Sequence, residues 1–500
     1  MELIAHILLG FSVALTPENL LYGLVGCALG TAIGVLPGIG PIATISLLLP
    51  VTFALPPIGG LIMLAGIYYG SQYGGSTTAI LVNMPGESSA VVTCVDGYRM
   101  ARAGRAGAAL TVAALGSFFA GTVATLVIAG LATPLARVAV SFGPPEFASL
   151  MLLGLLASIV LASGSFMKAL GMIFLGLLLG SVGTDVNSGM SRYTFGYFEL
   201  AEGINFVALA VGVFGIAEIL SNLEKRRHEA VTTQKLSRLW LSPEDVRASA
   251  PAVGRGTVIG SLLGLIPGGG ILLSTFAAYA VEKKLSPTPE RFGHGAIEGV
   301  AAPEAANNAA SQISFIPMLT LGIPPTASLA MMIWAMTIHG IQPGPLVMTK
   351  NPELFWGLIA SMWIGNAILL ILNLPLIGIW VKLLHVPYRL LFPAILLFCA
   401  VGVFSVNNAS FDIVLATLLG GFGYLLHKLG CEAAPLLLGF IIGPMLEEHL
   451  RRALLISRGD PAIFIERPIS AALLACSVAL LTLMVLPAFR RTREEALVGD

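Results

Sequence analysis

The segment GCALGTAIGVLPGIG at residues 26–40 decides how this chain folds, because the chain repeats it as GTVIGSLLGLIPGGG at residues 256–270. The second copy begins 230 residues after the first, and no gap is needed to align them. The shared positions are glycines and one proline: Gly26, Gly30, Gly34, Pro37, Gly38 and Gly40 recur as Gly256, Gly260, Gly264, Pro267, Gly268 and Gly270. A duplication of this kind predicts a molecule built from two related halves.

Each copy predicts a tightly packed helix that then breaks. Glycine at every fourth position leaves one helix face bare, so that another backbone can approach it closely. The Pro-Gly-x-Gly that follows ends the helix, because proline lacks an amide donor and glycine frees the backbone. Backbone groups freed at membrane depth must be buried in protein or line a polar cavity, and duplicated broken helices surround substrate sites in transporters. Tight packing alone and chance similarity are the alternatives.

The composition is that of a membrane protein. Of the 500 residues, 56% are hydrophobic and 11% are charged, whereas soluble globular proteins carry about 25% charged residues; the mean hydropathy is +0.88. The apolar runs predict an all-α polytopic membrane protein with about eleven or twelve transmembrane helices. The net charge is zero and the five cysteines have no CxxC spacing, so neither nucleic-acid binding nor a disulfide framework, metal site or bound cofactor is predicted.

The apolar run at residues 3–15 is expected to belong to the mature protein. It begins beside the acidic Glu2 and has no basic start, whereas a secretory signal peptide begins with a positively charged region. A cleaved signal is the alternative.

Positive charge predicts the orientation of the spans. The most charged loop, residues 222–255, carries seven lysines and arginines and is therefore placed in the cytoplasm. An even number of apolar spans, near 107–131, 146–163, 166–182 and 203–221, separates it from the loop holding Arg99, Arg102 and Arg105. Both loops therefore fall on the same side.

The two glycine motifs are predicted to enter the membrane from opposite sides. The segment before the first motif, residues 1–25, has no lysine or arginine, whereas the cationic loop precedes the second. This asymmetry predicts an inverted-topology repeat with broken or re-entrant helices. The predicted units are residues 1–221 for the first repeat, 222–255 for a cytoplasmic linker, 256–467 for the second repeat, and 468–500 for a last helix with a basic tail.

Later apolar runs near 353–372, 391–404, 411–427, 434–446 and 469–487 return the tail to the cytoplasm. The arginines at 451, 452, 458 and 467 conflict with this topology, because they would face outward unless 434–467 is re-entrant or lies along the interface. Charged residues near the span ends are expected to act as interfacial anchors: Arg137, Lys168, Asp185, Arg192, Asp412 and Glu432.

A polar cluster follows each broken helix. Pro85 and Pro324 align the two clusters at a separation of 239 residues. A proline followed by hydroxyl residues is typical of a helix start, and two helix starts that face each other would offer positive dipole ends to a carboxylate. Ordinary capping without a ligand is the alternative. The substrate-binding candidates are Ser76, Thr77, Thr78, Asn83, Gly86, Glu87, Ser88 and Ser89, with Thr320, Gly322, Thr326 and Ser328 opposite.

A third polar group lies on one predicted helix face: Glu304, Asn307, Asn308 and Ser311 follow the spacing i, i+3, i+4, i+7. These oxygens could coordinate Na⁺, and Glu304 could carry a proton, since an ionisable residue within a span is by default functional. The alternative is a helix near the membrane edge whose polar face meets water. No lysine or arginine lies inside the repeated motifs, so the charge of an anionic ligand must be met by dipoles and co-bound cations.

Together these stretches resemble the large membrane subunit of the tripartite tricarboxylate transporters, the TctA-like family. The resemblance rests on YYGSQYGGSTTAILVNMPGESSAVVTCVDGYRMARAGRAG, the repeated PGxG, EAANNAA, LTLGIPP and GPMLEEHLRRALLISRGD. It implies uptake of citrate or another carboxylate across the bacterial inner membrane, coupled to Na⁺ or H⁺. It also implies two partners, a small membrane subunit of about four helices and a periplasmic solute-binding protein. Ser71 and Pro325 stand where the family pattern has glycines. Pro325 removes an amide donor at a helix start that is expected to face the anion, so a carboxylate other than citrate is an alternative substrate.

An intramembrane enzyme and a channel are the rival classes. No HExxH motif occurs in the sequence, and no nucleophile with a base or pair of aspartates is apparent, so an enzyme is not expected. A channel needs no substrate-sized pocket at a repeat interface. The favoured mechanism is alternating access, in which a block carrying both broken motifs moves against a scaffold that includes spans 107–131, 146–182 and 353–372.

Overall fold

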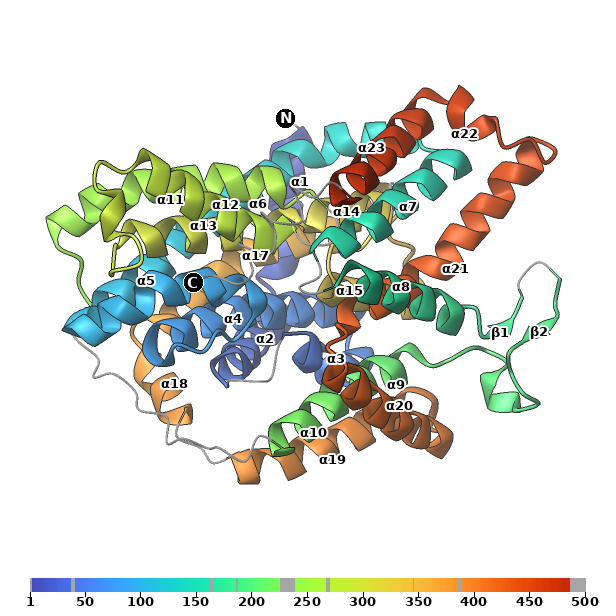
Figure 1. The fold of residues 1–500 in the computed structure, drawn as a ribbon, viewed down its shortest axis with the longest axis horizontal. Coiled ribbons are helices and arrows are strands. Elements are labelled where there is room, and N and C mark those ends of the chain that lie inside the picture. Colours follow the sequence, from blue (N-terminus) through green and yellow to red (C-terminus); the bar gives the residue numbers. More distant parts are fainter. Residues whose placement is uncertain are drawn as a thin grey trace.

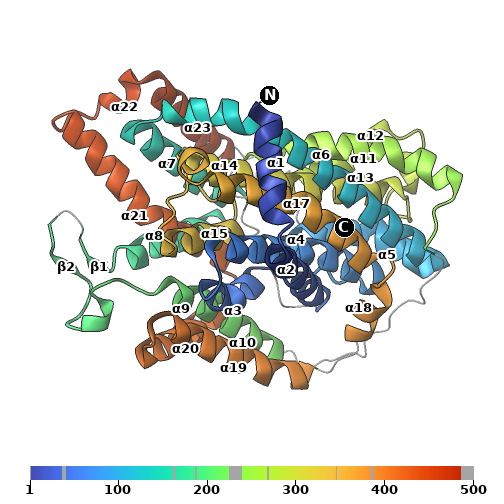
Figure 2. The ribbon, with the colours of Figure 1, turned by 180° about the vertical axis from the view of Figure 1, so that it is seen from behind.

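The computed structural model describes residues 2–36, 41–161, 165–185, 188–224, 239–266, 270–344, 346–384 and 388–485. It is 81% helical, which confirms the predicted all-α polytopic membrane fold (Figures 1 and 2). Among the described residues the only strands are β1 (Gly183–Thr184) and β2 (Ser191–Arg192), an antiparallel pair that places Gly183 opposite Arg192. This hairpin projects from the helical body at one end of the molecule (Figure 1).

The first half of the chain runs from the N-terminal helix to the charged linker. Its helices are α1 (Glu2–Ala14), α2 (Pro17–Val35), α3 (Pro41–Phe53), α4 (Pro57–Val82), η1 (Ser88–Ala90), α5 (Val91–Met100), η2 (Ala101–Arg105), α6 (Ala106–Val140), α7 (Pro144–Leu161), α8 (Phe166–Gly180), η3 (Phe198–Leu200), α9 (Phe206–Ala210), η4 (Val211–Ile216) and α10 (Ala217–Glu224).

The second half follows the linker, of which residues 225–238 lie outside the described part. Its helices are α11 (Pro243–Leu263), α12 (Gly270–Leu285), η5 (Pro289–Arg291), α13 (Glu298–Ile313), α14 (Phe315–Leu321), α15 (Ala327–Ile338), α16 (Val347–Lys350), α17 (Pro352–Asn373), α18 (Ile377–Leu383), α19 (Tyr388–Asn407), α20 (Ser410–Lys428), α21 (Ala433–Ile456), α22 (Ile463–Glu466) and α23 (Pro468–Val485).

The predicted spans correspond to helices of this fold. Within the described residues, five helical segments are long and apolar enough to cross a bilayer by themselves: Pro17–Val35, Ser88–Ala132, Pro352–Asn373, Ser410–Lys428 and Ala433–Ile456. Shorter apolar helices, such as α7, α8 and α23, account for further predicted crossings. α21 is one helix of 24 residues, long and apolar enough to cross a bilayer, which favours a span over a re-entrant turn for the helical part of 434–467.

The glycine motifs make the close contacts that their spacing predicts. A Cβ at Gly30 of α2 would lie 2.3 Å from the Ile67 carbonyl oxygen of α4, and a Cβ at Gly260 of α11 would lie 2.3 Å from the Ala306 oxygen of α13. The neighbouring glycines of each motif repeat this contact one turn away. In the first half, Gly26, Gly30 and Gly34 contact Met63, Ile67 and Ser71. In the second half, Gly256, Gly260 and Gly264 contact Ala302, Ala306 and Ala310. Each residue contacted in the second half lies 239 positions after the corresponding residue of the first.

Helices of each half also pack on helices of the other half. The η1–α5 segment of the first half packs on α12 and α13 of the second, and α15 of the second half packs on α3 and α4 of the first. Likewise α6 packs on α13 and α11, whereas α17 packs on α4 and α2. Each half therefore completes the core of the other, so neither is a self-contained domain.

Ion pairs join the loops that the predicted topology puts on one side. Arg105 contacts Asp245 at 2.5 Å, which brings the arginine loop beside the end of the linker. Lys428 pairs with Glu224, at the other end of that linker. The prediction that both arginine-rich loops share one side agrees with these contacts.

Carboxylates pair with three of the four arginines that conflicted with the positive-inside rule. Arg467 contacts Glu146 at 2.5 Å, and Arg452 contacts Glu448 at 2.5 Å. Arg451 contacts Asp185 of the hairpin segment at 3.1 Å. These three arginines can therefore lie on the outer side of the membrane, because the carboxylates beside them balance their charges.

Candidate functional site

Each half of the chain breaks its core helix in the same way. α4 ends at Val82 with Asn83 in the left-handed conformation (φ 57°), and α14 ends at Leu321 with Gly322 in the same conformation (φ 70°). The chain then extends to Glu87 and Thr326, the N-cap residues of η1 and α15. Both pairs are 239 residues apart, so the two breaks are equivalent in backbone design.

The predicted helix starts exist, but the prolines do not form their first turns. Pro85 and Pro324 lie in non-helical segments before the N-caps, so that part of the prediction is wrong. At the second start the Thr326 hydroxyl accepts a hydrogen bond from the Leu329 amide at 3.2 Å. At the first, the Glu87 side chain makes no such bond to the helix.

A buried hydroxyl, that of Tyr68 in α4, lies beside one helix start and within electrostatic range of the other. The Tyr68 side chain is 2% exposed, its hydroxyl has no hydrogen-bond partner among the described residues, and the side chains of Ser311 and Thr326 are its neighbours. Glu87, at the other helix start, interacts with it through its charge. An unpartnered donor beside the start of α15 favours an anion.

Glu87 lies at this junction and is half-buried. Its Oε1 accepts hydrogen bonds from Ser89 Oγ at 2.7 Å and from Asn307 Nδ2 at 3.2 Å. Asn307 Oδ1 and the buried Oε1 of Gln72 have no hydrogen-bond partner among the described residues. Because buried polar atoms normally have a partner, the junction has unused capacity to bind a polar ligand.

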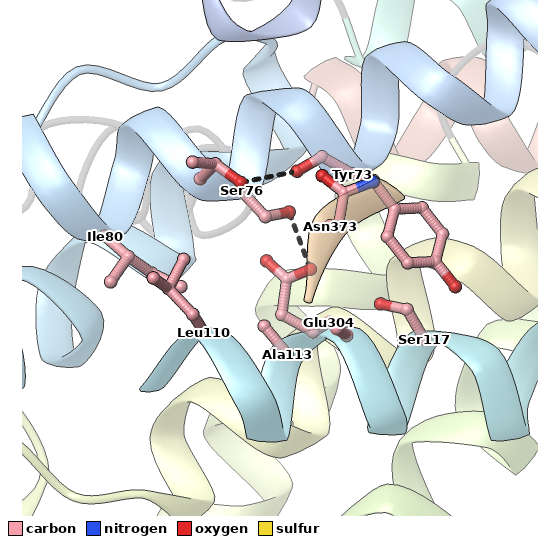
Figure 3. A pocket seen from close by; sticks show the side chains of 10 residues that line it. Tyr73, Ser76, Ile80, Leu110, Ala113, Ser117, Glu304 and Asn373 are labelled. Atoms are coloured by element: carbon pink, nitrogen blue, oxygen red, sulfur yellow. Dashed lines mark hydrogen bonds between the residues drawn. The ribbon is translucent and has the colours of Figure 1, made fainter. Parts of the chain in front are cut away.

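Glu304 occupies a second, deeper position on α13. Its Oε2 lies 2.7 Å from Ser76 Oγ of α4, and its Oε1 contacts Thr93 Oγ1 of α5. Figure 3 shows the hydrogen bond between the Ser76 hydroxyl and this carboxyl group, with a small pocket beside it. The pocket, which Tyr73, Ser117 and Asn373 also line, has room for about one water molecule.

The polar face of α13 is enclosed by protein, so the alternative in which it meets water is wrong. Glu304, Asn307, Asn308 and Ser311 are each 4% exposed or less. Asn308 Nδ2 donates to Ser117 Oγ of α6 at 2.6 Å. The face thus contacts α4, α5 and α6 together.

The remaining substrate candidates are spread around the site. Thr77 lines the small pocket, whereas Thr78 and Thr320 hydrogen-bond carbonyls of their own helices, at 2.9 and 2.7 Å. Asn83 and Ser88 are exposed, and Ser328 is buried in the first turn of α15. The two glycines among the candidates make close backbone contacts: a Cβ at Gly86 would lie 2.4 Å from the Gly34 oxygen, and one at Gly322 would lie 2.8 Å from the Pro343 oxygen.

The broken-helix motifs are described only in part. α2 and α11 end at Val35 and Leu263, within one helical turn of the two PGxG segments, which confirms that both helices stop before these segments. Gly264 caps α11 and Gly270 begins α12. The other predicted motif residues, Pro37, Gly38, Gly40, Pro267 and Gly268, lie outside the described residues.

Sequence reasoning missed several residues of the site: Tyr68, Gln72, Tyr73, Thr93 and Ser117. A signal existed for Gln72, since an amide within an apolar helix calls for a partner, and it precedes Ser76 by one helical turn. No local signal distinguished Thr93 or Ser117 from other hydroxyl residues of membrane helices.

A further buried carboxylate that the sequence prediction missed joins the two halves. Asp96 of α5 accepts hydrogen bonds from the amides of Gly293, Gly295 and Ala296, at 2.7–3.0 Å for its Oδ1, and from the Tyr279 hydroxyl at 2.9 Å. The side chain is fully buried. It therefore holds the segment that leads into α13 against α5.

Comparison with known proteins agrees with this architecture. The family model described as "Tripartite tricarboxylate transporter TctA family" matches residues 20–438. An "Uncharacterized 52.8 kDa protein in TAR-I ttuC' 3'region" of Agrobacterium vitis is 59% identical over 500 residues, covering all of both chains. An "Uncharacterized protein in TAR-II ttuC' 3'region" of the same organism is 58% identical over 241 residues, 48% of this chain and all of that protein. No solved structure matches.

Proposed function

We propose that this chain, which belongs to the tripartite tricarboxylate transporter TctA family, imports a di- or tricarboxylate into the cell by alternating access. The family match identifies a multi-pass membrane transporter subunit. The observation that carries the finer proposal is the unpartnered, buried Tyr68 hydroxyl, which lies beside Thr326 at one helix start and within electrostatic range of Glu87 at the other.

The junction suits a carboxylate because of its donors and dipoles. Oriented amides at helix N-termini and hydroxyl groups can bind an anion at membrane depth without a lysine or arginine. Glu87 opposes an anion there, since like charges repel. We therefore propose that substrate binding is coupled to a cation, Na⁺ or H⁺, held near the polar face of α13.

Alternating access is supported by the packing of helices of each half on the other half. A pseudo-two-fold relation between the halves accounts for two observations. The α2–α4 and α11–α13 glycine contacts have the same spacing, and α5 packs on the second half as α15 packs on the first. With the asymmetry of charge between the two motif entrances, this relation supports an inverted repeat. In this mechanism the α2–α4 and α11–α13 units, which carry both motifs, move against helices such as α6–α8 and α17.

The tripartite family implies partner subunits. We propose that a periplasmic solute-binding protein delivers the carboxylate and that a small membrane subunit of about four helices completes the complex in the inner membrane. The hairpin side of the molecule is proposed to face the periplasm, because the predicted topology places it opposite the cationic linker.

Uptake tests this function. Cells that express the chain with both partners are expected to accumulate at least one acid from a radiolabelled panel of C3 to C6 di- and tricarboxylates. Accumulation should saturate and should stop when the ion gradients are collapsed. If all three proteins are present and assembled but no acid enters the cells, the substrate assignment is refuted.

Changes at the two helix starts test the binding site. Thr326→Ala and Ser88→Ala are expected to raise the KM for uptake several-fold, because each removes a hydroxyl at a proposed anion-binding helix start. Thr326→Ala also removes a helix cap worth about 1 kcal/mol, so Thr326→Ser, which keeps the cap and the hydroxyl, is the matched control. Kinetics unchanged in both alanine variants would exclude these hydroxyls from the site.

A further inference from the structure

We infer that the coupling ion of this transporter is a proton, carried by Glu304 between Ser76 and Thr93. The inference rests on the proposed transport function and decides between the two cations that the function leaves open. Three features of the site support a proton: the hydrogen bonds of Glu304, the absence of a cation facing it among the described residues, and the short distance between its Oε2 and Ser76 Oγ.

Ser76 and Thr93 can each donate one hydrogen to a Glu304 carboxylate, but Ser76 then has none left for its second acceptor. Ser76 Oγ lies 2.7 Å from Glu304 Oε2 and 3.1 Å from the Gln72 carbonyl oxygen, and both are hydrogen-bond distances. A serine hydroxyl has one hydrogen, so it cannot donate to two acceptors at full strength. If Glu304 is protonated, its hydroxyl donates to Ser76 Oγ, which donates to Gln72, and Thr93 donates to the other carboxyl oxygen. The neutral acid thus satisfies every contact.

No cation faces Glu304 within the described residues. The titratable groups that interact with it are Tyr73 of α4, Cys94 of α5 and Glu87 before η1, none of which is positive when charged. From α6 it faces Ser117 and apolar side chains.

The helices on the other side of α13 do not supply a cation either. α11 and α12 pack on that side around Ala302 and Ala306. Of their cations, Arg255 pairs with Glu282 at 2.5 Å, and Arg247, Lys283 and Lys284 are exposed. An isolated buried carboxylate takes up a proton, because its charged form would carry a large desolvation penalty. Glu304 is therefore expected to hold a proton when it occupies this enclosure.

The oxygen spacing does not suit Na⁺. Ca²⁺, an ion close to Na⁺ in size, is held by six to eight oxygens at about 2.3–2.6 Å, so oxygens of different side chains that share such an ion stand roughly 3 Å or more apart. Ser76 Oγ and Glu304 Oε2 lie closer together than that, at 2.7 Å. The pocket beside them has room for about one water molecule. A hydrogen fits between these oxygens where a sodium ion does not.

The proton site is linked to the proposed substrate junction. Glu87 interacts electrostatically with Glu304, and consecutive α13 residues contact the two regions: Asn307 donates to Glu87, and Asn308 donates to Ser117 beside the Glu304 pocket. A proton on Glu304 removes one negative charge near the junction. Proton binding at Glu304 and anion binding at the junction therefore favour each other. Glu304 thus carries one proton into the cell with each substrate anion.

The Glu304→Gln variant tests the inference in membrane vesicles that contain the assembled transporter, with the acid that the wild type takes up best. Glutamine keeps the shape and the hydrogen-bonding capacity of the neutral acid but cannot release a proton. We expect wild-type accumulation to follow an imposed pH gradient and to need no Na⁺. In Glu304→Gln, accumulation driven by the pH gradient should fall about tenfold or more, while exchange of internal for external substrate persists.

Glu298→Gln is the matched control, because it makes the same change on the same helix. Glu298 has only a weak contact with Arg291, at 3.8 Å, so this variant should behave like the wild type. A pH dye inside the vesicles gives a readout that does not depend on any variant: acid entry should lower the internal pH. Wild-type uptake driven by Na⁺ alone, no substrate-dependent acidification, or full accumulation in Glu304→Gln would each overturn the inference. If the wild type exchanges no acid at all, the proposed function fails, and the inference fails with it.

Discussion

Replacing Gly260 with alanine is expected to abolish transport and to destabilise the protein by about 1–3 kcal/mol or more. The added Cβ would lie 2.3 Å from the Ala306 carbonyl oxygen and 2.8 Å from its Cα, and real Cβ atoms do not approach backbone so closely. Since the obstacle is main chain, no rotamer change can relieve it, and α11 must move away from α13. Gly30→Ala is expected to separate α2 from α4 for the same reason.

Gly254 provides the control on the same helix, because a Cβ there would meet no atom within 4 Å. Thermal unfolding in detergent and substrate uptake should be normal in Gly254→Ala and impaired in Gly260→Ala. The bulkier changes Gly34→Leu and Gly264→Leu are expected to abolish transport while the protein still inserts into the membrane. Full stability and uptake in Gly260→Ala would show that the helices do not pack as closely as described.

Asp96→Ala is expected to destabilise the junction between the two halves by about 3 kcal/mol or more, since each buried donor left unsatisfied costs about 1–3 kcal/mol. The change removes the acceptor for three backbone amides, of Gly293, Gly295 and Ala296, and for the Tyr279 hydroxyl. Buried donors left without a partner lose their hydrogen bonds and do not regain contact with water. The segment before α13 should then detach from α5, and uptake should fall with it.

Tyr279→Phe tests the same cluster more gently. It removes one donor and leaves Asp96 bonded to the three amides, so a loss of about 1 kcal/mol is expected. Thermal unfolding of both variants, with uptake measured at a temperature where both are folded, gives the comparison. Equal stability of Asp96→Ala and wild type would mean that this cluster does not hold the halves together.

Local chemistry made much of the fold predictable. Glycines four residues apart need a backbone neighbour wherever they occur on a membrane helix, and the structure supplies α4 for Gly30 and α13 for Gly260. Likewise the PGxG segments end helices for reasons internal to the segment. The span edges were less predictable: the apolar run at 434–446 continues as helix to Ile456, because ion pairs allow charged residues to prolong it.

The site was predictable only in part. Residues of one helix face, such as Glu304 and Asn308, could be grouped by spacing. Their partners could not, because Ser76 and Thr93 are 228 and 211 residues from Glu304 in the chain. The hydroxyls of Thr78 and Thr320 bond to their own helices, as threonine in an apolar helix commonly does, so their contact with substrate stays a prediction.

The sequence by itself determined that this is a polytopic helical membrane protein of two related halves, with helices that break at Pro-Gly-x-Gly. Those properties depend on composition and on interactions within a few residues. Only the tertiary structure decided which polar groups meet: Glu87 with Asn307, Glu304 with Ser76 and Thr93, and Asp96 with the segment before α13. The reason is physical, since these contacts arise where helices of one half pack into the other, and hydrogen bonding at such crossings depends on helix placement that no local pattern encodes.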